Sequence, residues 1–199
     1  MLRLIFSLGA RYEMKYWYPL FCFIVIIGCS IATDKQIVTR VSPGPKYVAW
    51  WSRIEFAPVH KEIRGVPVHQ LDSSWRLASE LCKEAIPSEL LLEWGTDIMQ
   101  ESDSSFFLYG DFNKDGVEDL ALVGVYENKS GERGSFVLIL SKDNQGRWHK
   151  SFLEYLGKPG FTALSKKNDS IEVWFCLECD FGALLIWDTE TRKYLLKPF

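Results

Sequence analysis

The stretch from residue 111 to residue 119 constrains this chain most, because it places oxygen-bearing side chains at alternate positions around a glycine. It reads Asp-Phe-Asn-Lys-Asp-Gly-Val-Glu-Asp, with side-chain oxygens at the first, third, fifth and ninth places. Alternate spacing lets a tightly curled backbone direct one side chain after another at a common centre, and the glycine permits the sharp turn. A main-chain carbonyl at the seventh place could complete the set of oxygens. The pattern predicts a loop that binds a hard cation such as calcium.

Two other interpretations of this stretch differ in what they require. An EF-hand needs a glutamate at the twelfth place of its loop, where this chain has Leu122, and helices on both sides. A plain hairpin turn needs only a good turn pair, which Asp115-Gly116 provides. Three aspartates this close together would repel one another without a cation or protons, which favours a bound ion. Calcium is preferred to magnesium because five or more protein oxygens suit its larger, looser coordination shell.

The residues from Gly110 to Leu120 resemble the metal loop of FG-GAP and VCBS repeats. They fill every position of its pattern, Gly-Asp-x-Asn-x-Asp-Gly-x-x-Asp-Leu. The resemblance implies a strand on either side of the loop, and it implies these calcium ligands: Asp111, Asn113, Asp115, Asp119 and the carbonyl of Val117. The sequence holds no second copy with this spacing. We therefore do not expect the complete propeller of FG-GAP proteins, and their adhesion role does not follow from one loop.

Composition bounds the rest of the chain. Its 199 residues are 47% hydrophobic and 15% aromatic, which is enough for one domain with a well-formed core. The net charge is -3, whereas a nucleic-acid partner would call for a basic patch. We therefore expect no nucleic-acid partner.

The N-terminal residues have the pattern of an export signal. Basic residues precede the uncharged run LFCFIVIIG, which ends at Gly28. The next residue is Cys29, and Ile-Ile-Gly-Cys resembles the lipobox of bacterial lipoproteins, in which the cysteine is acylated. In that family Ser30 would favour the outer membrane. An ordinary secretory signal and an uncleaved anchor are alternatives, but the run is shorter than the roughly 20 residues of a spanning helix.

These features predict three segments. Residues 1–28 would be the lipoprotein signal peptide, although Met14 could also be the true start. Residues 29–46 are polar, contain Pro43-Gly44-Pro45 and would form a tether from the lipid. Residues 47–199 would form a single β-rich domain that carries the calcium-type loop.

The predicted fold class is α+β, β-rich, with a helix packed on an antiparallel β-meander. Asp72 or Ser73 could cap a helix whose apolar residues recur at intervals of three and four up to Ile86. After it come short segments rich in branched and aromatic residues, separated by turn-forming clusters. The segments expected to be strands are 105–109, 120–126, 135–140, 148–155, 171–177, 183–187 and 193–196.

The pair Cys176 and Cys179 lies at the end of a predicted strand. In an oxidising envelope it could close as a disulfide that stiffens the hairpin. Free thiols and a redox or metal site are the alternatives, although redox pairs usually begin at a helix N-terminus. Cys82 falls on the apolar face of the predicted helix and is expected to be a small core residue.

The sequence lacks the common catalytic and nucleotide-binding motifs, such as a G-x-S-x-G elbow or a phosphate-binding loop. We therefore expect a non-enzymatic envelope lipoprotein, anchored to the membrane by its lipid, with a protein or glycan partner that the sequence does not identify. The alternative is an envelope enzyme. It would be a thiol redox protein that uses Cys176 and Cys179, or a hydrolase with carboxylates near the metal.

Overall fold

The computed structural model describes residues 37–44, 49–92, 97–179 and 181–199. The predicted signal peptide and Cys29 lie outside the described residues, as does part of the tether. Within the predicted tether, residues Val38–Val41 form strand β1, which pairs with β2, and the side chain of Ile37 is buried. The folded part therefore begins earlier than residue 47, the boundary expected from the sequence. None of the described helices is long and apolar enough to cross a membrane.

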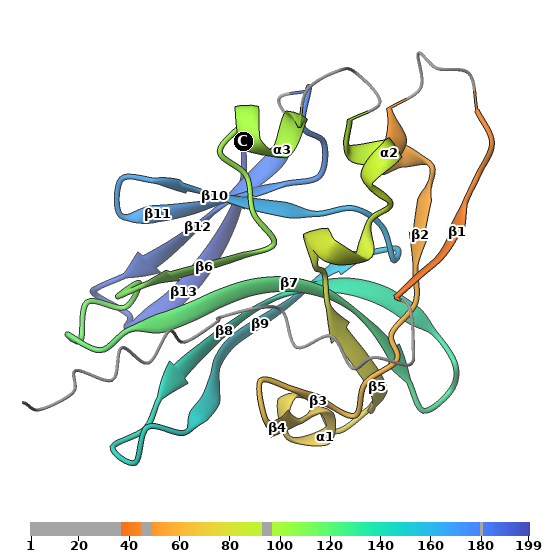
Figure 1. Cartoon of the computed structure of the whole chain (residues 1–199). Coiled ribbons are helices and arrows are strands. Elements are labelled where there is room, and N and C mark those ends of the chain that lie inside the picture. Colours follow the sequence, from red (N-terminus) through yellow and green to blue (C-terminus); the bar gives the residue numbers. More distant parts are fainter. Residues whose placement is uncertain (1–36, 45–48, 93–96, 180) are drawn as a thin grey trace, which may run out of the picture.

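The larger sheet is built around β7. Strands β7, β8 and β9 form an antiparallel meander, and two shorter strands share the other edge of β7 end to end (Figure 1). Of these, β6 pairs with the first half of β7 and β5 with the second half. The strands of this sheet are β5 (Trp75–Glu80), β6 (Phe107–Gly110), β7 (Asp119–Asn128), β8 (Arg133–Lys142) and β9 (Trp148–Gly157).

The smaller sheet is an antiparallel meander in chain order and packs on one face of the larger sheet (Figure 1). A bridge between Ser105 and Leu164 connects the chain before β6 to β10. Its strands are β10 (Ala163–Lys167), β11 (Ser170–Trp174), β12 (Gly182–Asp188) and β13 (Lys193–Pro198).

The remaining elements are short. The hairpin of β3 and β4 and the helix α1 contact the outer face of the larger sheet, whereas β1 and β2 form a separate hairpin. These elements are β1 (Val38–Val41), β2 (Ile54–Phe56), β3 (Glu62–Ile63), β4 (Val66–Pro67), α1 (Val68–Leu71), α2 (Ser88–Leu91), α3 (Ile98–Glu101), η1 (Trp50–Ser52) and η2 (Lys83–Ala85).

The core has two parts because both faces of β7 are buried. Along β7, Leu120 and Leu122 point to the outer face, while Ala121 and Val123 point to the smaller sheet. This explains why β7 is apolar at nearly every position rather than at every second one. Gly124 allows a close approach, since a Cβ there would lie 2.4 Å from both the Phe136 ring and a carbonyl of β5.

The β-rich class and the antiparallel pairing expected from the sequence are confirmed, but the predicted helix is wrong. Of the stretch expected to be helical up to Ile86, residues Trp75–Glu80 form strand β5, and the later segment Lys83–Ala85 forms only a short 3-10 helix. The pairing of β5 with β7 skips Arg76, which is a bulged residue. The bulge brings Trp75 and Ala78 onto the same face although they are three positions apart. A bulged strand therefore produces the three-residue spacing that is typical of a helix.

Candidate metal loop and adjoining cleft

The loop from residue 111 to residue 118 connects β6 to β7, so strands flank it on both sides. Two of its residues have a left-handed backbone, Lys114 with φ 60° and Gly116 with φ 85°. A Cβ built on Gly116 would meet no atom within 4 Å. The glycine is therefore required by the backbone conformation and not by crowding.

Three side chains of the loop turn their oxygens onto amides of the same loop. The N–H of Asp115 donates to Oδ1 of Asp111 at 3.0 Å and to Oδ1 of Asn113 at 2.9 Å. The N–H of Gly116 donates to Oδ2 of Asp111 at 2.9 Å, and the N–H of Val117 donates to Oδ1 of Asp115 at 2.8 Å. Oxygens from two different side chains thus lie within 3.0 Å of one nitrogen atom.

Asp119 closes the loop from inside the protein. Its side chain is fully buried at the start of β7, and its Oδ2 accepts from the N–H groups of Phe112 and Asn113 at 3.0 and 3.3 Å. The hydroxyl of Tyr194 on β13 donates to the same oxygen at 3.3 Å. The hydroxyl of Ser141 on β8 donates to Oδ1. Asp119 therefore joins the loop to both sheets.

Burial dominates the electrostatics at this carboxylate. It raises the pKa of Asp119, while the hydrogen bonds from Ser141 and the two loop amides lower the pKa by less, and the charge of Asp115 raises it further. Burial also raises the pKa of the Tyr194 hydroxyl, and the neighbouring Asp119 charge adds to this effect. Tyr194 therefore stays protonated and acts as a hydrogen-bond donor.

The five predicted ligands differ in how well they suit a cation. A carboxylate or amide oxygen has two lone pairs, so the oxygens of Asp111, Asn113 and Asp115 that accept amides retain capacity for a hard cation. Oδ2 of Asp119 already accepts three hydrogen bonds and fits less well. The side chain of Val117 is 41% exposed. Within the described ranges, no three His, Cys, Asp or Glu side chains stand in a group that could hold a metal.

A cleft of 440 Å³ opens beside the loop. Asn113 of the loop forms one side, and residues 149–152 of β9 form another. Trp187 and residues 192–194 of the β12–β13 hairpin form the rest of the lining. The cleft therefore lies between the two sheets at the end that carries the loop, and Asn113 belongs to both features.

Hydrogen bonds connect this cleft to the buried carboxylate. The hydroxyl of Ser151, which lines the cleft, donates to the hydroxyl of Ser141 at 2.6 Å, and Ser141 donates to Asp119. Lys150 also belongs to the lining, but its Nζ donates to the carbonyl of Leu71 on the outer face of the larger sheet. Ser151 thus presents an oriented hydroxyl to the cleft, whereas the Lys150 ammonium lies elsewhere.

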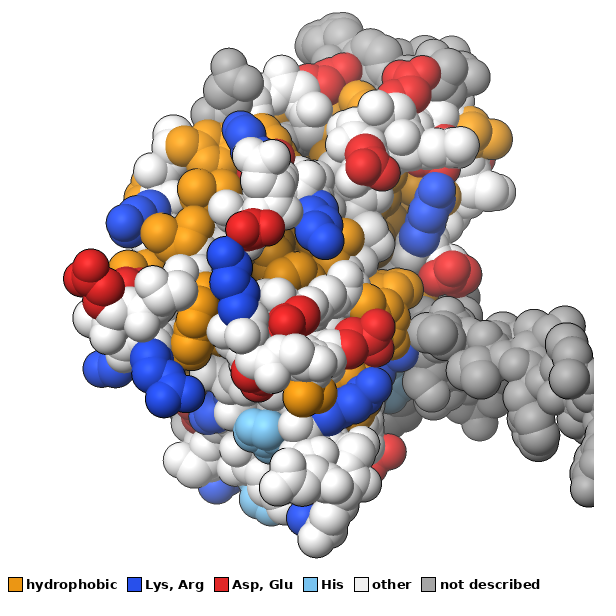
Figure 2. Space-filling view, turned by 90° about the vertical axis from the view of Figure 1, so that its left-hand side faces the viewer, with side chains coloured by type: hydrophobic (Ala, Val, Ile, Leu, Met, Phe, Trp, Pro, Cys, Tyr) orange, Lys and Arg blue, Asp and Glu red, His pale blue; other side chains and the backbone are white. Residues whose placement is uncertain are grey.

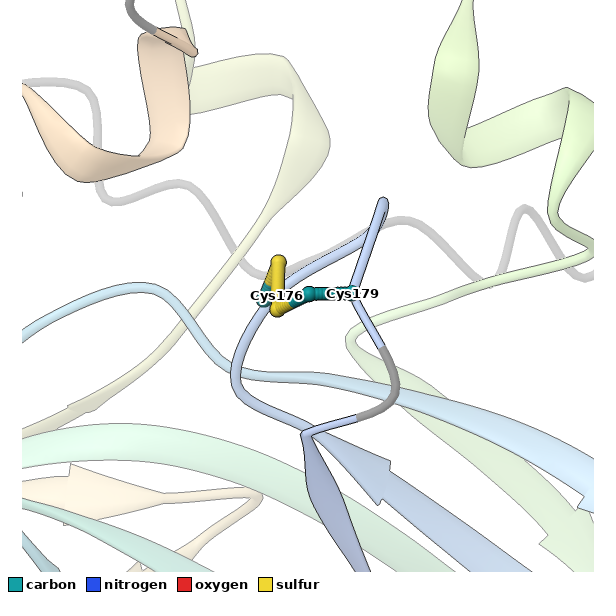
Figure 3. The surroundings of a disulfide bond; sticks show 2 residues. All are labelled: Cys176 and Cys179. Carbon is teal, nitrogen blue, oxygen red and sulfur yellow. A yellow bond between two sulfur atoms is a disulfide. The ribbon is translucent and has the colours of Figure 1, made fainter.

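Cys176 and Cys179 are joined by a disulfide with a Cα–Cα distance of 5.6 Å, in the segment between β11 and β12 (Figure 3). At the other end of β11, Asp169 forms an ion pair with Lys114 of the loop at 2.9 Å. The two predicted sites therefore lie at opposite ends of the smaller sheet. Cys82 is a buried free thiol, as a core role requires.

The structure brings the predicted loop residues together, and it adds partners that the sequence does not indicate. Ser141 and Tyr194 are 22 and 75 positions away from Asp119. No local pattern marks them, because the pairing of strands places them there. Comparison of the chain with known protein families, with curated protein sequences and with solved structures gives no match.

Proposed function

We propose that this protein is a non-enzymatic lipoprotein of the bacterial cell envelope with one calcium-stabilised β-rich module. Lipid on Cys29 would hold it at the outer membrane, and the module would act as a binding or structural unit. The observation that carries the calcium proposal is the convergence of Asp111 and Asn113 oxygens on a single loop amide. A loop already curled around its own oxygens needs little rearrangement to surround a cation.

In this proposal Asp111, Asn113 and Asp115 hold the ion, with the Val117 carbonyl as a further donor. Calcium would neutralise the negative charge of the loop, and its binding free energy would add to the stability of the fold. Asp119 acts mainly as an internal brace, since hydrogen bonds from both sheets occupy its oxygens.

The position of the loop supports a stabilising role. Besides the contacts of Asp119, Lys114 forms an ion pair with Asp169 at the β10–β11 turn, and Lys142 of β8 pairs with Glu118 at 3.4 Å. The loop thus contacts both sheets from one end. Ordering it would hold the two sheets in their packed arrangement.

The described geometry favours a binding or structural role over the two enzyme alternatives. The cleft beside the loop has no carboxylate among the described residues that line it, whereas a hydrolase of the expected kind needs a pair. The Cys176–Cys179 pair lies between two strands, and none of the helices in the described ranges begins at Cys176. It therefore lacks the helix N-terminus that lowers the thiol pKa in redox proteins.

Thermal unfolding of the full-length protein in detergent tests the calcium proposal. We expect excess chelator to lower the melting temperature and calcium, but not magnesium, to restore it. At a calcium concentration of about 100 Kd the stabilisation would be about 2.7 kcal/mol, or roughly 5–10 °C. The variant Asp111→Asn/Asp115→Asn keeps one amide-accepting oxygen on each side chain but removes two charges, so it should lose most of the response. An unchanged melt in chelator would count against the proposal.

Labelling with palmitate tests the anchor separately. Cells that express the full chain should incorporate label into the protein, and the Cys29→Ser variant should not. Label that persists in the variant, or that is absent from both proteins, contradicts lipidation at Cys29. A Met14→Leu variant shows which start is used: the protein is still produced if translation starts at Met1, and it is lost if translation starts at Met14.

A further inference from the structure

We propose that the cleft beside the loop binds an acidic saccharide, that is, a sugar carrying a carboxylate or a phosphate group. This inference rests on the proposed binding role and names a ligand class for it. Three independent properties of the lining carry this inference: positive charge without an ion-pair partner among the described residues, an aromatic wall with fixed orientation, and hydrogen-bonding groups on the opposite side.

The positive charge lies on the β12–β13 hairpin. Arg192 and Lys193 are exposed cleft residues, and neither forms an ion pair with any carboxylate in the described parts of the chain. Many other basic side chains of this protein do have such partners, for example Arg64 with Glu80 and Arg133 with Glu127. These two cations border one cleft and favour an anionic group of the ligand at this end. A guanidinium can bind such a group with two hydrogen bonds.

The backbone of the β12–β13 hairpin fixes the positions of Arg192 and Lys193. Arg192 has a left-handed backbone with φ 53° at the β12–β13 turn, and Lys193 is the first residue of β13, paired with Asp188. The side chain of Asp188 accepts hydrogen bonds from the N–H of Glu190 and the hydroxyl of Thr191, which order the turn. The two cations are thus carried by a structured hairpin.

The aromatic wall is Trp187, which is half-buried. Its ring contacts the ring of Tyr194 edge to face with centroids 4.8 Å apart, and Tyr194 in turn contacts Phe152 at 5.6 Å. These contacts fix the indole orientation at the cleft. An aromatic face beside polar groups suits a sugar ring, which is apolar on its C–H faces and polar at its edge.

Other polar groups complete the cleft on the side of β9 and the loop. Ser151 presents a hydroxyl that is oriented through Ser141, and Asn113 and His149 add further polar groups. The oxygen of Ser151 can accept from a sugar hydroxyl, because its own hydrogen is donated to Ser141, and the other polar groups can form further hydrogen bonds. The positive charges of Arg192 and Lys193 place the acidic group of the ligand at their end of the cleft.

The surface around the cleft argues against a nucleic acid as the ligand. Figure 2 shows the end of the molecule that bears the β12–β13 turn, where basic, acidic and apolar side chains are interspersed. A nucleic acid would need a continuous basic stripe along its backbone. Two cations at one end of a small cleft instead match a single acidic group on a small ligand.

Titration of the full-length protein in detergent tests the inference, with tryptophan fluorescence and calorimetry as readouts. The probes are an oligosaccharide of uronic acids, a hexose phosphate, and a neutral oligosaccharide of the same length as the first. We expect at least one acidic probe to bind about tenfold more tightly than the neutral one, as one charge-assisted hydrogen bond provides. Preference for one acidic probe identifies the anionic group as a carboxylate or a phosphate.

Charge variants show whether the cleft is responsible. Arg192→Gln/Lys193→Gln should weaken binding of the acidic probe by about tenfold or more. The control Lys129→Gln/Lys158→Gln removes the same charge from exposed positions at the far end of the larger sheet, and it should bind normally. Equal affinity for acidic and neutral probes, no binding of either acidic probe, or equal binding by both double variants would overturn the inference.

Repeating the titration in chelator separates this inference from the calcium proposal. Binding that depends on Arg192 and Lys193 in chelator supports the cleft even if calcium has no effect on the melting temperature. Conversely, a calcium-dependent melt without any saccharide binding overturns only the inference.

Discussion

The hydroxyl of Tyr194 on β13 donates to Oδ2 of Asp119, 3.3 Å away at the start of β7. Asp119 is fully buried, so this hydrogen bond connects the two sheets through a carboxylate that water does not reach. The same carboxylate accepts from Ser141 of β8 and from two amides of the loop. The packing of the sheets and the conformation of the loop therefore depend on one side chain.

Tyr194→Phe should destabilise the protein by about 1–2 kcal/mol, because it leaves a buried acceptor with one partner fewer. Urea denaturation measures the change in the free energy of unfolding. Tyr109→Phe is the matched control, since its hydroxyl donates no hydrogen bond to any described residue, and we expect a change below about 0.5 kcal/mol. Equal effects of the two substitutions would show that the link to Asp119 does not contribute.

Gly116→Ala should destabilise the loop by about 1 kcal/mol or more, because φ 85° is strained for alanine although the space around the Cβ is open. It should also reduce the calcium-dependent rise in melting temperature. Gly160→Ala serves as control, because Gly160 does not have a positive φ and a Cβ there has only one neighbour, at 3.9 Å. A Gly116→Ala protein as stable as the Gly160→Ala protein contradicts the requirement for glycine.

Glu80→Gln should change the free energy of unfolding by an amount that depends on pH, because Glu80 is partly buried. Burial raises the pKa of Glu80, and the Arg64 guanidinium, 2.8 Å away, lowers it by less. The stability due to Glu80 is therefore present below its unfolded pKa of about 4.3 and is lost as the pH rises through the raised folded pKa. The variant does not undergo this loss. The amount by which its free energy of unfolding lies below that of the unchanged protein, its deficit, should therefore shrink between about pH 4 and pH 7.

Glu172→Gln provides the control of opposite sign. Burial raises the pKa of Glu172, but the hydrogen bonds from Lys167 and Ser165 outweigh it, so the pKa is lowered overall. The deficit of this variant should grow as the pH rises from about 3 towards the unfolded pKa of about 4.3. Denaturation curves across this pH range measure the deficits of both variants. A Glu80→Gln deficit that also grows with pH would mean that the ion pair outweighs burial.

Cys176→Ser/Cys179→Ser should lower the free energy of unfolding by up to about 2 kcal/mol, because the disulfide closes a short loop in the unfolded chain. Reductant should have a similar effect on the unchanged protein and none on the double variant. Cys82→Ala leaves the pair intact and should keep the response to reductant. If reductant does not change the stability of the unchanged protein, the disulfide has no stabilising role.

The sequence was sufficient for features whose causes are local. Within the loop, the hydrogen bonds span at most seven residues, so spacing and one glycine are enough to predict its curled conformation. The hairpins flanking β8 were predictable for the same reason, since turn-forming clusters separate strands with strongly apolar patterns.

The errors arise where tertiary pairing changes a local pattern. The bulge at Arg76 turned a strand into an apparent helical repeat, and nothing near Arg76 in the chain signals a bulge. Strand β10 was missed because Ala163–Lys167 is short and ends in two lysines. The cleft could not be predicted at all, since Asn113, Ser151 and Trp187 come together only when two sheets pack.

The edge of β7 that β5 and β6 share helps to fix the register of this strand. Because β5 and β6 each bind half of this edge while β8 binds the whole of the other, the register of β7 is set independently by three partners. A slip of one residue would exchange the two faces of the strand and turn Asp119 away from Tyr194. Such a slip would have to break all three pairings at once. The arrangement therefore disfavours misfolded pairings that would place the Asp119 carboxylate on the wrong face of the sheet.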